Sequence, residues 1–253
     1  MTKAYDDATY GERIATAYDQ FYPSYDENAI ERLFELAAGG RVLELGIGTG
    51  RIALPLAQRG LEVVGIDASE AMVQRLRAKP GGDEIRVVKG SFAQMPRELD
   101  QDRFDLVFTV FNTFFALLTQ EEQLRCFRSA AAHLVDGEAG QRSGRFLIEA
   151  FVPDLTRFED GQAVRLVHLS DDSVRLDVAQ LDPTAQQISS QHVVLTEEGP
   201  QLYPVKLRYA WPAELNLMAK LAGLTLQHRW GSWQKDPFTD QSGKHVSVYG
   251  PAA

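Results

Sequence analysis

The chain has 253 residues, of which 44% are hydrophobic and 24% charged, which is typical of a globular protein with its own core. Its formal net charge of −9 disfavours nucleic acid as a partner, because nucleic acid calls for a basic face. The single cysteine, Cys126, excludes a disulfide framework, and no histidine pair has metal-ligand spacing, so we expect no metal. The polar first residues and the lack of roughly 18 consecutive apolar residues lead us to expect a cytoplasmic protein without a membrane partner.

The first 40 residues predict helices that precede the main fold. Four aromatic residues crowd positions 18–25, and the apolar residues between 29 and 37 recur at helical spacing. The pair Gly39-Gly40 ends this helix. We expect residues 1–40 to form an N-terminal helical lid.

Residues 41–150 alternate short apolar segments with helical ones. Ser69 is a predicted N-cap, and Thr119 with Glu122 forms a capping box. The polar, glycine-rich segment 136–144 predicts a mobile loop. The alternation predicts a parallel sheet with right-handed crossovers. The predicted strands cover residues 41–45, 62–67, 85–89, 104–111 and 145–150.

The pattern changes after Pro153. Residues 163–210 carry β-type segments separated by turn signals, which predicts an antiparallel β insertion at 151–211. The insertion follows the fifth strand at the carboxyl edge of the sheet. We therefore expect it to cover the mouth of the active site.

The end of the chain returns to the main fold. A helix is predicted at 212–222, followed by a strand pair at 224–230 and 245–249. The fold class is therefore α/β, a doubly wound, Rossmann-like, seven-stranded and mostly parallel sheet with an antiparallel β insertion. We place the core at residues 41–150 and 212–253.

A glycine turn, Glu44-Leu45-Gly46-Ile47-Gly48-Thr49-Gly50, lies between a predicted strand and helix. Ligands of open α/β sheets bind at such strand ends. A dinucleotide site requires G-x-G-x-x-G, but the third glycine falls one residue early and Arg51 takes the later position. The carboxylate of Glu44 suits a cationic cofactor better than a diphosphate. S-adenosylmethionine, with a sulfonium and an ammonium, is such a cofactor.

Asp67 ends the second predicted strand, about 20 residues after the turn, as the ribose-binding acid of nucleotide sites does. Its carboxylate can accept hydrogen bonds from both ribose hydroxyls. The alternative is that Asp67 only starts the next helix as part of Asp67-Ala68-Ser69. The glycine turn, the acidic strand end and the order of the strands together favour the ribose role.

Residues 41–150 resemble the core of class I S-adenosylmethionine-dependent methyltransferases. The resemblance implies that Glu44 and the glycines face the methionine end of the cofactor, that Asp67 binds the ribose, that Phe92 packs on adenine, and that the end of strand four lies beneath the methionine moiety. The acidic residue that relatives often carry near adenine is replaced by Ser91. The implied cofactor-binding residues are Tyr18, Glu44, Gly46, Gly48, Gly50, Asp67, Ala68, Met72, Ser91, Phe92, Phe111 and Asn112.

The run Tyr18-Asp19-Gln20-Phe21-Tyr22 resembles the N-terminal segment of small-molecule N-methyltransferases, including those acting on amino sugars. Tyr18 and Tyr22 are therefore our candidate catalytic residues, because a tyrosine hydroxyl there can accept a hydrogen bond from the acceptor or contact the cofactor. The alternative is a helix that packs its aromatic face on the core.

Other residues are weaker candidates for the acceptor pocket. His192 lies in the insertion, near the expected substrate roof, although any single histidine is more often structural. Arg165, Tyr203, Tyr209 and Trp211 either line the acceptor pocket, form a subunit contact, or belong to an ordinary half-buried sheet.

The sequence thus predicts a methyltransferase that acts on an amine or hydroxyl of a small-molecule acceptor by in-line displacement, mainly through proximity and orientation. Two alternatives remain open. A nicotinamide-dependent oxidoreductase would need the dinucleotide spacing and a Tyr/Lys pair. A non-catalytic cofactor-binding partner subunit would have a blocked acceptor mouth. A homodimer is possible.

Overall fold

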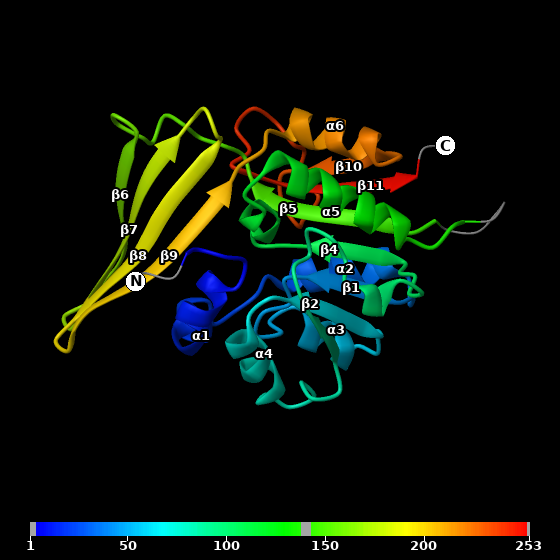
Figure 1. The fold of residues 1–253 in the computed structure, drawn as a ribbon, viewed down its shortest axis with the longest axis horizontal. Helices are drawn as coiled ribbons and strands as arrows, with labels where there is room; N and C mark the ends of the chain where they lie inside the picture. The colour runs from blue at the N-terminus through cyan, green and yellow to red at the C-terminus, as the bar shows by residue number, and fades with distance from the viewer. Residues whose placement is uncertain (1–3, 138–142, 252–253) are drawn as a thin grey trace.

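The computed structural model describes residues 4–137 and 143–251, so most of the predicted loop at 136–144 lies outside the described residues. Seven of its strands form one sheet, in the order β10-β11-β5-β4-β1-β2-β3 (Figure 1). Strands β1 to β5 pair in parallel, whereas β11 is antiparallel to β5 and β10. This confirms the predicted Rossmann-like sheet. The strands are β1 (Val42–Leu45), β2 (Val63–Asp67), β3 (Arg86–Lys89), β4 (Leu106–Thr109), β5 (Arg145–Phe151), β10 (Leu224–Trp230) and β11 (Lys244–Pro251).

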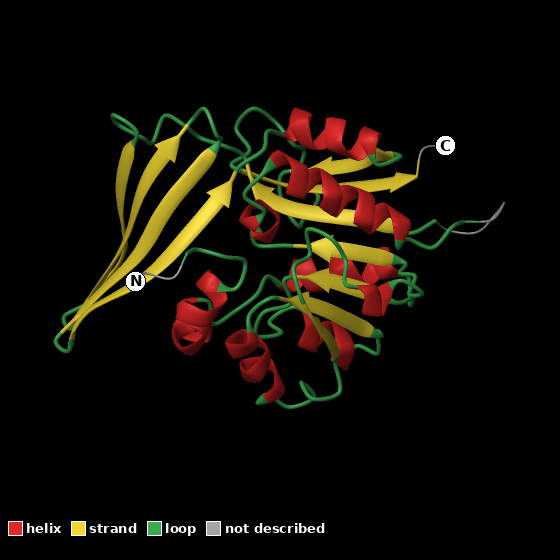
Figure 2. Cartoon of the chain, viewed as in Figure 1, coloured by secondary structure: helices red, strands yellow, loops and turns green. Residues whose placement is uncertain are grey.

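Helices cover both faces of this sheet (Figure 2). On one face, α2 (Glu27–Ala37) and α3 (Ala53–Gln58) share a buried apolar cluster with the sheet. On the other face, α5 (Gln120–Ala132) and α6 (Pro212–Leu221) pack in a second cluster. The helix α4 (Glu70–Arg77) follows β2. The sheet is therefore buried on both sides, which explains its nearly continuous apolar strands.

Two helix starts form as the sequence predicts. The Ser69 hydroxyl accepts a hydrogen bond from the Met72 amide at 3.2 Å. Thr119 and Glu122 form a complete capping box, in which each side chain accepts from the other residue's amide. These contacts satisfy amides that the first turn leaves without a helical partner.

The fourth strand is shorter than the predicted 104–111, since regular pairing covers only Leu106–Thr109. Phe104 forms an isolated bridge with Leu134 instead. At the other end Phe111 has a φ of 60°, which turns the chain out of the sheet. The apolar run in the sequence does not show where this strand begins and ends. Residues at both ends of the run are buried by side-chain packing, although they are outside the regular strand pairing.

A separate four-stranded antiparallel sheet projects from one end of the main sheet (Figure 1). It confirms the β insertion. The N-terminal helix α1 (Thr9–Phe21) contacts both this sheet and α4. Ile14 of α1 is fully buried in an apolar cluster with Met72 and Tyr203. The strands follow chain order as β6 (Gln162–Leu169), β7 (Ser173–Asp182), β8 (Gln187–Thr196) and β9 (Gly199–Arg208).

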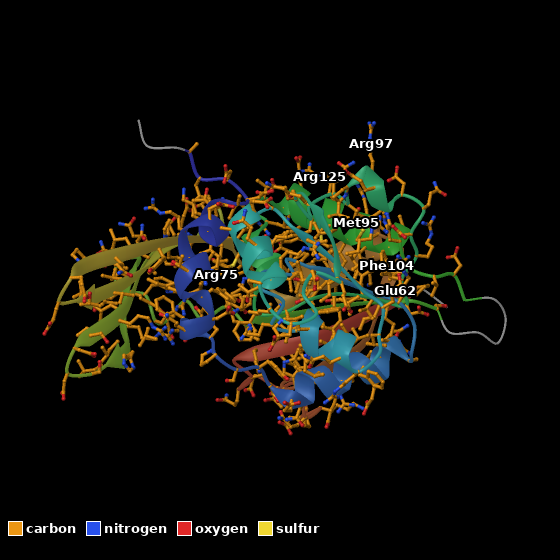
Figure 3. The ribbon with its side chains drawn as sticks, turned by 90° about the horizontal axis from the view of Figure 1, so that it is seen from below. Glu62, Arg75, Met95, Arg97, Phe104 and Arg125 are labelled. Carbon is orange, nitrogen blue, oxygen red and sulfur yellow. The ribbon has the colours of Figure 1, made fainter. Side chains whose placement is uncertain are left out.

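Two short 3-10 helices, η1 (Arg97–Leu99) and η2 (Thr113–Ala116), lie on either side of β4 in the chain. Figure 3 shows Met95 and Phe104 pointing inward and Arg97 outward, consistent with 5% and 0% exposure for the two apolar residues. The connection between β3 and β4 is thus anchored by apolar side chains.

Within the described ranges, no helix is long and apolar enough to cross a membrane. In the same ranges, no group of three or more histidine, cysteine, aspartate or glutamate side chains is placed to hold a metal ion.

Candidate active site

The glycine turn lies where the strand order reverses, since β1 pairs with β2 on one side and β4 on the other. Gly46 and Gly48 adopt φ values of 76° and 56°. A Cβ on Gly46 would lie 2.4 Å from the Thr113 side chain, so the turn needs glycine there for both space and conformation. The bare backbone leaves room for a ligand at the carboxyl ends of the strands.

Asp67 is fixed against this turn. Its Oδ2 accepts a hydrogen bond from the Gly48 amide at 2.7 Å, and its Oδ1 accepts one from the Ser69 amide at 2.8 Å. Burial raises the pKa of Asp67, although these amides act in the opposite direction. Each carboxylate oxygen keeps a further lone pair, so a diol can bind to a carboxylate that is already in place.

Glu44 lies beneath the same hollow and is 4% exposed. Burial raises its pKa well above the usual value, and the nearby Asp67 raises it further, while Arg51 lowers it. Its Oε2 is buried and has no hydrogen-bond partner among the described residues. A buried, unpartnered carboxylate oxygen is a site for a cation or a strong donor.

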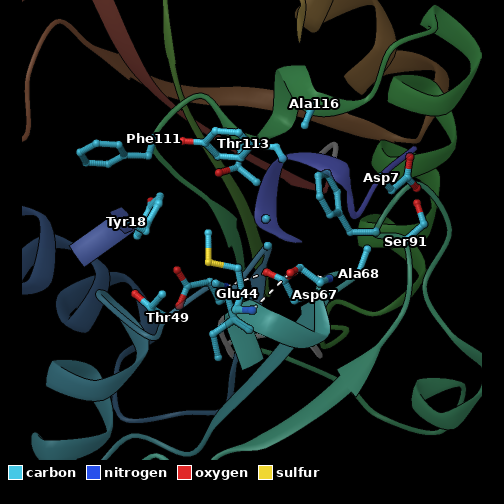
Figure 4. A pocket seen from close by; sticks show the side chains of 18 of the residues that line it. Asp7, Tyr18, Glu44, Thr49, Asp67, Ala68, Ser91, Phe111, Thr113 and Ala116 are labelled. Carbon is cyan, nitrogen blue, oxygen red and sulfur yellow. Dashed lines mark hydrogen bonds between the residues drawn. The ribbon is translucent and has the colours of Figure 1, made fainter. Parts of the chain in front are cut away.

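These groups line one elongated cavity (Figure 4). Tyr18 and Phe111 lie at one end and Ala68 and Ser91 at the other, with the two carboxylates between them. The predicted cofactor-binding residues that line it are Tyr18, Glu44, Gly46, Gly48, Asp67, Ala68, Met72, Ser91, Phe92 and Phe111.

An aromatic wall with a cation closes one end of this cavity. The ring centroids of Tyr18 and Tyr22 lie 5.0 Å apart, and those of Tyr22 and Phe111 lie 6.0 Å apart. The Arg51 guanidinium lies 3.5 Å from the Phe111 ring centroid. Burial raises the pKa of Tyr18 to about 12, so its hydroxyl is neutral near pH 7. Sequence reasoning missed Arg51, although its position directly after the glycine turn was the available signal.

Phe111 and Asn112 form a strained turn after β4, with φ values of 60° and 65°. Left-handed conformation is unfavourable for an aromatic residue and is often found at functional sites. Glu149 holds the turn, because its Oε2 accepts from the Phe111 amide at 3.1 Å. Its Oε1 accepts from the Trp233 ring nitrogen at 3.0 Å. The buried Trp233 therefore helps to orient Glu149.

A second cavity of about 550 Å³ adjoins the first, and both share Tyr10, Tyr18 and Phe111. The four-stranded sheet forms much of its wall, with Asp177 and His192 among the lining residues. The four-stranded sheet and α1 thus enclose a second space. It lies beside the end of the first cavity at which Tyr18 and Phe111 are found.

The remaining predicted residues lie elsewhere. Gly50 does not line the first cavity, and a Cβ there would clash with Leu76 at 2.2 Å, so its role is close packing. Asn112 and Tyr22 line only the second cavity, and Asn112 Oδ1 accepts from the Phe151 amide at 2.7 Å. Of the weaker candidates, Arg165 and His192 line the second cavity, Tyr203 and Tyr209 are buried, and Trp211 is 42% exposed.

Comparisons with known proteins identify the family of this chain. A family model described as a methyltransferase domain matches residues 42–137. The cypemycin N-terminal methyltransferase of a Streptomyces species is 32% identical over 212 residues, covering 83% of this chain and 82% of that protein. The solved CcbJ methyltransferase from Streptomyces caelestis is 42% identical, with a TM-score of 0.88 over 98% of this chain and 100% of the other.

An amino pentose methyltransferase from Micromonospora echinaspora, solved with S-adenosylmethionine bound, shares the fold at 20% identity, with a TM-score of 0.67 over the full length of both chains. The sheet and the glycine turn fit a methyltransferase. The two Streptomyces relatives show that the chain belongs to the class I S-adenosylmethionine-dependent methyltransferases. S-adenosylmethionine is therefore its cofactor. This decides against a nicotinamide-dependent oxidoreductase.

The first cavity fits this cofactor chemically. The unpartnered Oε2 of Glu44 can accept from the ammonium, and Arg51 can pair with the carboxylate of the same amino acid moiety. Asp67, Ser91 and Phe92 line the same cavity, where the Asp67 carboxylate can accept from ribose hydroxyls and Phe92 can offer an apolar surface to the adenine. The cofactor supplies a methyl group already activated on a sulfonium, so the chain's residues bind, orient and exclude water.

Proposed function

We propose that this enzyme transfers a methyl group to an amine or a hydroxyl of a small-molecule acceptor that occupies the second cavity. The observation that carries the proposal is the shared wall of Tyr10, Tyr18 and Phe111 between the two cavities. An acceptor there would meet the methionine end of the cofactor. We favour nitrogen over oxygen, because one relative that covers 83% of the chain is named a cypemycin N-terminal methyltransferase.

Within this proposal, the acceptor is aligned rather than chemically activated by Tyr18 and Tyr22. Burial raises the pKa of both hydroxyls, so they are neutral hydrogen-bonding groups near pH 7. Holding the acceptor atom in line with the methyl–sulfur bond accelerates the transfer through proximity and orientation. The open second cavity, about 550 Å³ in volume, supports a catalytic chain over a partner subunit with a blocked mouth.

We also propose the division of the chain that the sequence suggests. Residues 1–40 would act as the lid, 151–211 would cover the acceptor, and 41–150 with 212–253 would bind the cofactor. The placement of α1 against the second sheet supports the lid role. Within the first 40 residues, α2 packs on the main sheet, so movement would be confined to α1 and its flanking residues.

Calorimetric titration tests the cofactor site. We expect binding of S-adenosylmethionine and not of NAD. Replacing Asp67 with Ala should weaken binding by about 1–3 kcal/mol, because hydrogen bonds to a charged group are lost. The matched control is Asp83→Ala, an exposed aspartate outside both cavities. Unchanged affinity in the Asp67 variant would remove this residue from its assigned role.

Product analysis tests the acceptor class. The enzyme, given S-adenosylmethionine, would be offered an amino sugar, a short peptide with a free N-terminus, and the matching hydroxyl compounds. We expect mass spectrometry to show added methyl groups on the amines. Methylation of the hydroxyl compounds alone would contradict the preference for nitrogen.

We further propose a homodimer through the outer face of the second sheet. Two cross-strand rows on this face are apolar, and a third row carries Gln191 between Val178 and Pro204. Each row contains exposed apolar residues, and we call the three rows the outer face. Four strands about 4.8 Å apart and about 30 Å long give this face an area of roughly 600 Å². A stable protein interface buries roughly 800 Å² of surface on each partner, which is of similar size. The exposed members are Val164 (72%), Leu166 (56%), Leu169 (66%), Leu195 (42%) and Leu202 (50%).

A further inference from the structure

Asp177 on β7 and His192 on β8 form a hydrogen-bonded pair in the wall of the second cavity. The sheet register places them directly opposite each other, with His192 Nδ1 2.5 Å from Asp177 Oδ1. The other carboxylate oxygen accepts a hydrogen bond from Arg165 at 2.7 Å. The side chains are only 22% and 18% exposed. The imidazole is therefore held in one orientation at the cavity wall.

The carboxylate decides which imidazole nitrogen carries the proton. Burial raises the pKa of Asp177, but hydrogen bonds from His192 and Arg165 outweigh it and hold that pKa below its usual value. An ionised carboxylate only accepts, so the proton of the pair lies on Nδ1. Nε2 then presents a lone pair, and no group within residues 4–137 and 143–251 forms a hydrogen bond with it. The same carboxylate stabilises an imidazolium if Nε2 takes up a proton.

The other ionisable groups around this pair are four tyrosines and four cations. Burial raises the pKa of the nearby tyrosines, so they are neutral: Tyr5, Tyr10, Tyr18 and Tyr22. The nearby cations are Arg157, Arg165, Arg175 and Lys206. Histidine is the side-chain type that exchanges protons between pH 5 and 8, and His192 is the histidine of this cavity within the described ranges.

We propose that His192, oriented by Asp177, takes the proton from the acceptor amine; this inference rests on the amine acceptor proposed above. A simple alkylamine has a pKa of about 10 and a peptide α-amine a pKa of about 8. Both are therefore mostly ammonium near pH 7, without a lone pair to attack. One N–H proton passes to Nε2 and gives an imidazolium beside Asp177. The freed lone pair forms the N–C bond as the C–S bond breaks, and the C–S electron pair remains on sulfur as a thioether. The imidazolium then returns its proton to solvent.

The pH dependence of turnover tests this role, with the amino sugar or peptide amine that the wild type methylates best. In His192→Gln, kcat/KM at pH 7 should fall roughly 100-fold. The deficit should shrink steadily toward pH 10, because solution then supplies free amine without help. Asp177→Asn should show the same convergence with a smaller loss. A residue with only a structural role would give a deficit that does not change with pH.

The matched control is His168→Gln, the same substitution at an exposed position of β6 on the same sheet. Each variant should bind S-adenosylhomocysteine like the wild type, which verifies the fold without turnover. Full activity of His192→Gln at pH 7, or a deficit independent of pH, would overturn the proposal. A wild type that methylates only hydroxyl compounds would refute the amine acceptor itself, a result separable from failure of the histidine alone.

Discussion

Asp19 of α1 binds the glycine turn directly, because its Oδ1 accepts a hydrogen bond from the Thr49 hydroxyl at 2.7 Å. Lys79 completes the contact, donating to Asp19 Oδ1 at 3.0 Å and to the Thr49 carbonyl at 2.8 Å. The helix that carries Tyr18 is thus tied to the loop that is to hold the cofactor. Binding of the cofactor and closure of α1 are expected to depend on each other.

The first prediction follows from this contact. Asp19→Asn should weaken S-adenosylmethionine binding about fivefold, since a net charged hydrogen bond worth about 1 kcal/mol is lost in a partly exposed site. Lys79→Met should have a similar effect. The double variant should lose less binding free energy than the sum of the two single losses, because both residues belong to one hydrogen-bond network. Calorimetry on the four proteins gives the coupling. Fully additive losses would show that the network does not act as a unit.

The second prediction concerns Glu44, whose buried Oε2 has no described partner. Its folded pKa is raised, so the folded apo protein loses stability as pH rises above the unfolded value near 4.5. Glu44→Gln should therefore stabilise the apo protein at pH 7 by about 1–3 kcal/mol while weakening S-adenosylmethionine binding. Denaturant unfolding with and without ligand measures both effects, with exposed Glu31→Gln as the control.

The features that could be predicted from the sequence depend on residues close together in the chain. The capping box at Thr119 and the N-cap at Ser69 depend on residues three apart, and the structure contains both. The glycine turn and Asp67 could be placed together, because parallel strands that follow one another bring their carboxyl ends to one edge of the sheet. Local spacing and one topological rule were therefore enough to predict that the glycine turn and Asp67 line one cavity.

The features missed depend on contacts between distant segments. Arg51 folds over Phe111, 60 residues away in sequence, and no local spacing marks that contact. Asp177 meets His192 only because the β7–β8 register aligns them, and a shift of one residue would turn one of the two to the opposite face. The sequence indicated His192 as a roof residue without indicating its partner.

The third prediction assigns Arg51 to the carboxylate of the cofactor's amino acid moiety. Arg51→Met keeps the length of the side chain and removes its charge, so affinity for S-adenosylmethionine should fall by about 1.5–3 kcal/mol. Affinity for methylthioadenosine, which lacks that moiety, should stay within twofold of the wild type. Equal losses for both ligands would instead indicate that Arg51 supports the shape of the cavity through Phe111.

The fourth prediction concerns the fully buried His245. Burial, aided by the charge of Arg229, lowers its pKa to about 3. Since the unfolded value is about 6.5, the unfolded chain takes up a proton that the folded chain refuses, and stability falls as pH drops below 6.5. The loss should approach about 1.4 kcal/mol per pH unit between pH 6 and 4.

His245→Asn removes this titration, so the variant should lose less stability than the wild type as pH falls over that range. The opposite contribution of Glu44 is common to both proteins and cancels in the difference. Denaturant unfolding of both proteins at pH 6 and 4.5 measures the difference. Salt-bridged acids with lowered pKa values, such as Asp102, lose their contribution only at lower pH and do not interfere. An equally steep loss in the variant would mean that another group takes up the proton.

The last prediction tests the outer face of the second sheet as a self-association surface. Leu202 is 50% exposed there, in a row with Val193, Leu176 and Leu166. A lysine at this position would be forced into a desolvated interface without a partner charge, which costs several kcal/mol across a symmetric contact. Leu202→Lys should therefore convert a dimer to a monomer in sedimentation while leaving S-adenosylmethionine binding intact. The control is Leu221→Lys, since Leu221 is 64% exposed on α6, away from this face. A wild type that sediments as a monomer at all concentrations, or a Leu202 variant that remains dimeric, would contradict an interface at this face.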